Sequence, residues 1–146
     1  MVKRNEHCLN SECPIACSLD LIGDHWTLLI VRSLMFEHRH EYKDLLAIPE
    51  RISSNILSDR LKKLEEEGLI RSVGHPESKR RKLYYLTDKG KDLIFVLLDI
   101  ARWGVRHLGR ADSIPPEKQA VLGSPPEQVA KFIFEDLKAW EKKFVR

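Results

Sequence analysis

The sequence has no apolar run long enough to span a membrane and no apolar signal segment at its start. Its uninterrupted apolar stretches, such as residues 28–31 and 93–98, are far shorter than the ~20 residues that a membrane helix needs. Residues 1–7 are mostly polar and charged, so nothing in them directs export. We therefore expect a cytoplasmic protein with no membrane partner.

Cysteine is also scarce. Three cysteines, Cys8, Cys13 and Cys17, are an odd number in a chain without an export signal, which argues against a disulfide framework. Cys13 and Cys17 would lie one helical turn apart with parallel side chains, so a direct bond between them would be strained. A zinc site would need His7 beside the cysteines, and their spacing lacks the usual Cys-x2-Cys pair. We expect no metal and no cofactor.

Catalytic signatures are missing as well. The chain has no glycine-rich phosphate loop and no Walker motif. A thiol enzyme would have to combine Cys13 with a histidine such as His25, without an acidic residue to orient that base. We therefore expect no catalytic residues and no enzyme activity.

Positive charge is modest in amount but uneven in placement. The net charge is only +3, which alone does not indicate a nucleic-acid partner. Residues 1–110 contain 19 Lys and Arg against 16 Asp and Glu, whereas residues 111–146 contain six of each. The densest cluster is the run of four cations at residues 79–82. Such a run is often only a solvated turn, but here it follows a predicted helix and lies between two predicted strands.

Residues 53–86 predict a capped helix followed by a β-hairpin. Ser53 is a typical N-cap, and Gly68 is a typical helix end. Helical spacing gathers Leu57, Leu61 and Leu64 into one apolar stripe and places polar side chains opposite it. Residues 69–74 and 82–86 are rich in strand formers and flank a turn at 76–81. This order predicts a mainly α fold with a small β-hairpin wing, a winged helix-turn-helix.

The remaining segments predict further helices around one core. The length of 146 residues suits a single domain with a modest appendage. We expect short helices at 13–23 and 41–47, the second with Tyr42, Leu45 and Leu46 facing inward. We also expect a central core helix capped by Asp24 that ends near residue 36. A long helix capped by Thr87 should reach about residue 108. Its apolar residues cover roughly 220° of arc, wider than one core needs, which indicates a homodimer.

The expected organisation has four parts. Residues 1–12 form a flexible arm, and residues 13–110 form the winged domain that also dimerises. Residues 111–126 contain two Pro-Pro pairs and predict a linker or an irregular connection. Residues 127–146 form an amphipathic helix that docks either on its own domain or on a partner subunit.

Three ordered blocks of residues 13–108 resemble the HxlR family of bacterial winged helix-turn-helix transcriptional regulators. They are Cys13-Pro14 followed by residues 21–30, LIGDHWTLLI; residues 57–70, LSDRLKKLEEEGLI; and Arg81 with residues 84–90, YYLTDKG. His25 stands where a lysine is usual. The resemblance implies sequence-specific binding to double-stranded DNA by a dimer, whose interface the helices at 13 and 87 mostly form. Two recognition helices would lie about one DNA turn, ~34 Å, apart.

By this resemblance, the helix from Ser53 is the recognition helix. Its N-terminal amides suit phosphates, and its short polar side chains suit base edges in the major groove. The cations of the wing suit the DNA backbone or minor groove. The candidate DNA-binding residues are Ser53, Ser54, Asn55, Ser58, Asp59, Lys62, Lys79, Arg80, Arg81 and Lys82.

Several roles stay open from the residues alone. Asp59 accepts a hydrogen bond from a cytosine amino group, or pairs with Lys62 or Lys63. Arg60 forms a structural ion pair or contacts a phosphate, and Arg81 contacts DNA or stays near the strands.

Cys13 has two interpretations. Some members of the family use a cysteine at this position as a redox or electrophile sensor, and backbone amides at a helix start stabilise a thiolate. Oxidation would then join Cys13 to another subunit or to Cys8. The other interpretation is a thiol that only packs. A small-molecule effector between the dimer helices, near Trp103 and Trp140, stays unidentified.

The alternative function is a winged-helix module that binds a protein partner or RNA without reading a DNA sequence. A steep salt dependence with a sequence-specific footprint would favour DNA.

Overall fold

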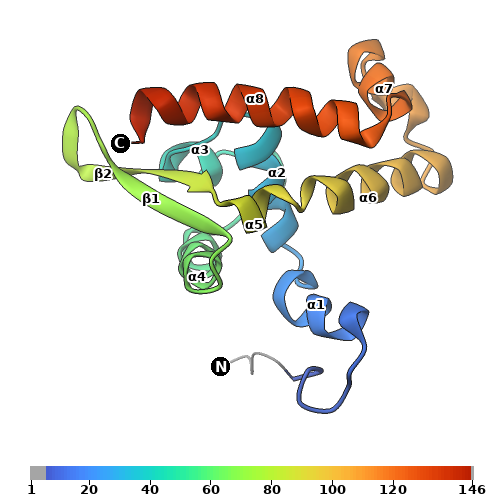
Figure 1. Ribbon diagram of the computed structural model, residues 1–146, viewed down its shortest axis with the longest axis horizontal. Coiled ribbons are helices and arrows are strands. Elements are labelled where there is room, and N and C mark those ends of the chain that lie inside the picture. The colour runs from blue at the N-terminus through green and yellow to red at the C-terminus, as the bar shows by residue number, and fades with distance from the viewer. Residues whose placement is uncertain (1–5, 146) are drawn as a thin grey trace.

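The structure, a computed structural model, describes residues 6–145. The expected fold class is confirmed, because the described chain is mainly helical and one two-stranded antiparallel hairpin projects from the helices (Figure 1). In chain order the elements are α1 (Pro14–Ile22), α2 (Thr27–Phe36), α3 (Tyr42–Leu46), α4 (Ser54–Glu66), β1 (Ile70–His75), β2 (Ser78–Leu86), α5 (Asp88–Lys91), α6 (Ile94–His107), the 3-10 turn η1 (Ala111–Ser113), α7 (Pro116–Gly123) and α8 (Pro126–Phe144).

The core forms around α2, as the sequence predicted. Val31 and Leu34 of α2 are fully buried, and the leucine stripe of α4 packs into the same cluster. In Figure 1, α8 and α4 lie on opposite sides of the hairpin base, and α1 extends away from the rest of the chain. The arrangement leaves the outer face of α4 and the hairpin on the surface.

Local signals set the helix ends. The Ser53 hydroxyl accepts a hydrogen bond from the Ile56 amide at 3.2 Å, and the Thr87 hydroxyl accepts one from the Gly90 amide at 3.2 Å. Gly68 follows the end of α4 with a φ of +73°, a backbone conformation that glycine adopts with less strain than other residues. A side chain at Gly90 would meet the carbonyl oxygen of Leu69, the residue before β1, so α5 needs glycine there to pack this closely. Both predicted caps are confirmed.

The hairpin differs from the prediction in the length of its second strand. β2 begins at Ser78, and Ser78 pairs with His75, so the turn contains only Pro76 and Glu77. The predicted turn at residues 76–81 was therefore too long, and residues 79–82 belong to a strand. Backbone pairing needs only amides and carbonyls, which lysine and arginine supply as well as apolar residues do.

The proline pairs begin helices instead of forming an irregular connection. Pro116 and Pro126 occupy the first turns of α7 and α8, where a missing N–H costs no hydrogen bond. Arg102 of α6 donates to the carbonyls of Leu122 and Ser124 at 2.9 and 3.0 Å, which holds the end of α7. The predicted 87–108 helix is also divided, into α5 and α6.

The C-terminal helix α8 docks on its own domain. Val129, Ala130 and Leu137 are buried against the shared core. Leu46, which we expected to face inward, is instead 37% exposed.

Membrane-spanning character is weak in residues 6–145. No single helix there is both long and apolar enough to cross a bilayer. α1 and α2 reach that composition only as a pair, bent by 78° where they meet.

Candidate nucleic-acid interface

The polar face of α4 lies on the surface of the protein. The opposite stripe, Leu57, Leu61 and Leu64, is at most 3% exposed. All six candidate residues at this helix are exposed: Ser53, Ser54, Asn55, Ser58, Asp59 and Lys62. Because the apolar stripe fixes the rotation of the helix, short polar side chains point to solvent along its outer side.

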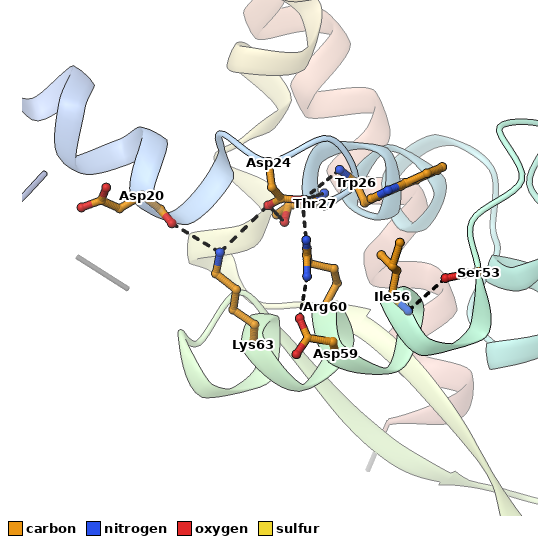
Figure 2. A network of polar contacts seen from close by, with 9 residues as sticks. All are labelled: Asp20, Asp24, Trp26, Thr27, Ser53, Ile56, Asp59, Arg60 and Lys63. Atoms are coloured by element: carbon orange, nitrogen blue, oxygen red, sulfur yellow. Dashed lines mark hydrogen bonds and ion pairs between the residues drawn. The ribbon is translucent and has the colours of Figure 1, made fainter. Parts of the chain in front are cut away.

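Asp24 holds α4 against the corner between α1 and α2 (Figure 2). Its carboxylate accepts hydrogen bonds from the Trp26 and Thr27 amides at 2.8 and 2.9 Å, and from the Thr27 hydroxyl. Arg60 of α4 donates to the same carboxylate at 3.0 Å. Asp24 is not the N-cap that the sequence predicted, because Trp26 holds that position, but it binds the first amides of α2 and also anchors α4.

The electrostatics of this corner favour the ionised carboxylate. Burial raises the pKa of Asp24, but hydrogen bonds from Thr27, Trp26 and Arg60 outweigh burial and lower the pKa to about 2. Lys63 adds a second contact, donating to the Asp20 carbonyl at 3.3 Å and lying 4.0 Å from Asp24. Two cations of α4 are thus directed inward and position the helix.

Arg60 and Asp59, whose roles the sequence left open, form an ion pair with each other. Arg60 Nη1 lies 2.5 Å from Asp59 Oδ2, and its Nε bonds Asp24. The structure therefore agrees with the interpretation of Arg60 as a member of a structural ion pair. Asp59 pairs with this arginine rather than with Lys62 or Lys63, while its side chain stays 65% exposed.

Tyr42 is a residue of this face that sequence reasoning missed. Its ring is partly buried and packs against the core, as expected. Its hydroxyl, however, lies 3.1 Å from the Ser58 Oγ and 3.1 Å from the Ser54 carbonyl oxygen. Tyr42 also lines a shallow hollow beside Ser58, Lys62 and Tyr84. A tyrosine has an apolar ring and a polar tip, and that dual character was the available signal.

The wing supplies exposed cations on β2. Lys79, Arg80, Arg81 and Lys82 are all exposed. Arg81 Nε donates to Glu41 Oε1 at 2.6 Å, and this bond lowers the pKa of Glu41. Arg81 therefore stays beside the strands. Within residues 6–145, the other three cations of the run have no carboxylate within 4.0 Å.

The cysteines pair differently from the prediction. Cys8 and Cys17 form a disulfide with their Cα atoms 4.8 Å apart, and Cys13 is free and exposed. The expectation that the cysteines form no disulfide framework was wrong. Cys8 is bonded to Cys17, so it is not free to bond Cys13 in this structure. A turn at residues 7–10 brings Cys8 back over α1, where its amide donates to the Asp20 carboxylate at 3.1 Å.

The structure offers no support for the zinc alternative. Two of its four ligands, Cys8 and Cys17, are bonded to each other. In the part of the chain that the structure describes, no three His, Cys, Asp or Glu side chains gather in a metal-binding arrangement. Residues 1–5 of the expected arm, and Arg146, lie outside the described residues.

Comparison with known proteins gives one consistent result. The family described as HxlR-like helix-turn-helix matches residues 21–112. The chain is 36% identical over 92 residues to the uncharacterized HTH-type transcriptional regulator YvaP of Bacillus subtilis. This match covers 62% of this chain and 84% of that protein. It is 28% identical over 111 residues to the HTH-type transcriptional regulator YodB of the same organism, covering 75% and 98%.

Solved structures of similar proteins agree. The reduced form of YodB from B. subtilis has a TM-score of 0.54 at 28% identity, covering 66% of this chain and 95% of that one. The oxidized form of the redox regulator HypR has a TM-score of 0.55 at 26% identity, covering 65% and 97%. Helix α8 begins after the family-matched segment ends.

Proposed function

The chain belongs to the HxlR-like helix-turn-helix family of DNA-binding transcriptional regulators, and we propose that it reads its operator with α4 in the major groove. The observation that carries this assignment of residues is the exposed polar face of α4, held opposite a fully buried leucine stripe. A helix fixed in this way presents the same side chains to every DNA site, which sequence reading requires.

The N-terminal half of α4 is the part proposed to contact bases. Ser54, Asn55 and Ser58 are short and exposed, so they can approach base edges without a large loss of side-chain entropy. An asparagine amide can donate and accept together, which matches the N6 and N7 atoms of adenine. Lys62, near the other end of the helix, is placed to meet a phosphate.

The wing is proposed to contact the sugar-phosphate backbone or the minor groove. Lys79, Arg80 and Lys82 supply three charges that no carboxylate of residues 6–145 neutralises within 4.0 Å. Arg81 is proposed to position the strand through Glu41 and to contact DNA only secondarily. Charges of this kind raise affinity for all sequences alike.

We propose that the protein acts as a homodimer through α1 and α6. No residue of α1 is buried, and Ile15 and Leu19 are 72% and 51% exposed. On α6, Ile100 and Trp103 are 52% and 60% exposed. Apolar side chains this exposed on two helices favour burial against a second copy. Two copies would present two α4 helices to a pseudo-palindromic operator, in the cytoplasm where the DNA is accessible.

We propose that thiol oxidation regulates DNA binding. YodB has been solved in reduced and diamide-treated forms, and HypR in reduced and oxidized forms. In this chain Cys13 is exposed and free to react. The Cys8 amide bonds the Asp20 carboxylate, and the Asp20 carbonyl accepts from Lys63 of α4. The turn that contains Cys8 is thus linked through Asp20 to Lys63 of α4.

Selection of genomic DNA fragments by the purified protein, followed by footprinting, tests the proposed function. We expect enrichment of a pseudo-palindromic sequence and a footprint whose affinity falls steeply with salt. Retention of fragments without a common sequence, or a complex insensitive to salt, would favour the protein- or RNA-binding alternative.

A further inference from the structure

The C-terminal helix α8 contacts the base of the wing through one pair of rings. Trp140 of α8 stacks on His40, with the ring centroids 3.7 Å apart and the planes 16° from parallel. His40 is only 4% exposed, in the segment between α2 and α3. We had placed Trp140 near an effector site between the dimer helices. Instead it lies against a buried histidine beside the wing.

His40 in turn holds strand β2 at Tyr84. Its Nδ1 lies 2.8 Å from the Tyr84 carbonyl oxygen, and its own carbonyl accepts from the Tyr84 amide at 2.7 Å. Burial, the largest effect on this ring, lowers the pKa of His40. The neutral ring then donates from Nδ1 to the strand. Both backbone groups of Tyr84 are therefore bonded to His40, and Trp140 covers the ring of His40.

Two ion pairs fix α8 along the same line. Asp136 Oδ2 lies 2.9 Å from His38 Nε2, and Glu141 Oε2 lies 2.8 Å from Lys91 Nζ. His38 precedes α3, and Lys91 ends α5, which follows β2 directly. Helix α8 is thus joined to the segment before α3 and to α5, which follows the wing.

We propose that α8 sets the position of the wing, with Trp140 and His40 as positioning residues that hold β2 at Tyr84. A two-stranded hairpin has little stability of its own in water, so its direction depends on what its base packs against. Lys79 lies five residues from Tyr84, roughly 16 Å along the strand at ~3.3 Å per residue. A small rotation at Tyr84 therefore moves the cations by several times the displacement at the base. The inference rests on the proposed contact between wing and DNA.

A double-mutant cycle separates positioning of the wing from general stability. Trp140→Ala removes the stacked ring, Trp140→Phe retains a ring, and Phe132→Ala is the control because Phe132 is 70% exposed on the same helix. Each is measured for operator affinity in the natural background and with Lys79→Ala and Arg80→Ala combined. We expect Trp140→Ala to weaken binding about 10-fold in the first background and less than about 2-fold in the second.

Trp140→Phe should restore most of the affinity, and Phe132→Ala should leave it unchanged. Asn55→Ala should weaken binding equally in both backgrounds, because α4 does not act through the wing. Equal losses for Trp140→Ala in both backgrounds would overturn the positioning role.

Hydrogen exchange of the free protein tests the same inference without DNA. We expect the Tyr84 amide to exchange faster in Trp140→Ala, while the amides of α4 stay as protected as before. Unchanged exchange at Tyr84 would overturn the inference even if the protein binds its operator. Faster exchange at Tyr84 in a protein that reads no DNA sequence would support the contact and reject the proposed function. If Trp140→Ala does not fold, Trp140→Leu takes its place.

Discussion

Arg60 donates a hydrogen bond to Asp24 at 3.0 Å and so joins α4 to the corner at which α2 begins. Asp24 also accepts hydrogen bonds from the Trp26 and Thr27 amides at the start of the core helix, so one carboxylate stabilises two elements that are far apart in sequence. The position of α4 on the protein surface therefore depends on the charge of this carboxylate.

Acid should weaken this corner. The folded-state pKa of Asp24 is about 2, below the ordinary aspartate value of 3.8, so its contribution to stability is full above about pH 4 and is lost as pH falls through about 2. A shift of this size corresponds to about 2 kcal/mol of unfolding free energy. Urea unfolding between pH 6 and 2 should show that Asp24→Asn loses less stability on acidification than the natural protein. Asp112→Asn, at an exposed position, is the matched control, and a parallel loss in all three proteins would contradict the prediction.

Neutralising the wing should reduce the salt dependence of DNA binding. Each lost phosphate contact lowers the slope of log affinity against log salt by ~0.9, so Lys79→Ala with Arg80→Ala should lower it by ~1.8. Affinity should fall alike for operator and unrelated DNA. Lys142→Ala with Lys143→Ala removes the same charge from α8 and should leave the slope unchanged. The wing has no role in binding DNA if both double variants keep the original slope.

The sequence predicted α4 and its surroundings well because the signals there are local. The Ser53 cap, the leucine stripe and Gly68 lie within one segment of 16 residues, and each acts on its neighbours in the chain. The outer face of the helix follows from that stripe by geometry. Tyr42 was missed because its contact with Ser58 depends on how α3 packs against α4.

Contacts between distant segments could not be predicted in this way. Nothing near Trp140 in the sequence indicates that it stacks on His40, 100 residues earlier in the chain. The Cys8–Cys17 bond lies beside a turn whose His7 and Cys8 amides donate to the Asp20 carboxylate, a contact that the cysteine spacing does not indicate. The length of β2 depends on pairing with β1, which overrides the low strand propensity of lysine.

A charge at the centre of the proposed dimer interface should separate the subunits. Trp103→Glu places a carboxylate on the exposed face of α6, where a second copy would have to bury it. Light scattering after size exclusion should give a dimer of the 17.0 kDa chain for the natural protein and a monomer for the variant. Phe132→Glu replaces another exposed apolar residue, one outside the proposed interface, and this variant should remain dimeric. A natural protein that is monomeric at micromolar concentration would reject the dimer.

Oxidation should change operator affinity through the thiols near α1. Diamide removes two electrons and two protons from a pair of thiols and leaves a disulfide. We expect treatment of the reduced protein to change affinity at least ~5-fold, by around 1 kcal/mol. Cys13→Ser and Cys8→Ser, assayed separately, identify the reacting thiol, and mass spectrometry identifies the bond. If both variants respond to diamide as the natural protein does, these thiols do not regulate binding.

The most direct test of base reading by α4 is the affinity of Asn55→Ala for a set of operator variants. Loss of one bidentate base contact should cost about 1–3 kcal/mol on the best operator and leave unrelated DNA nearly unaffected, so discrimination at one base pair disappears. Asn10→Ala, the same change on the segment before α1, should behave as the natural protein does. If Asn55→Ala keeps the full ranking of operator variants, this residue does not read the sequence, and the proposed face of α4 is not the recognition surface.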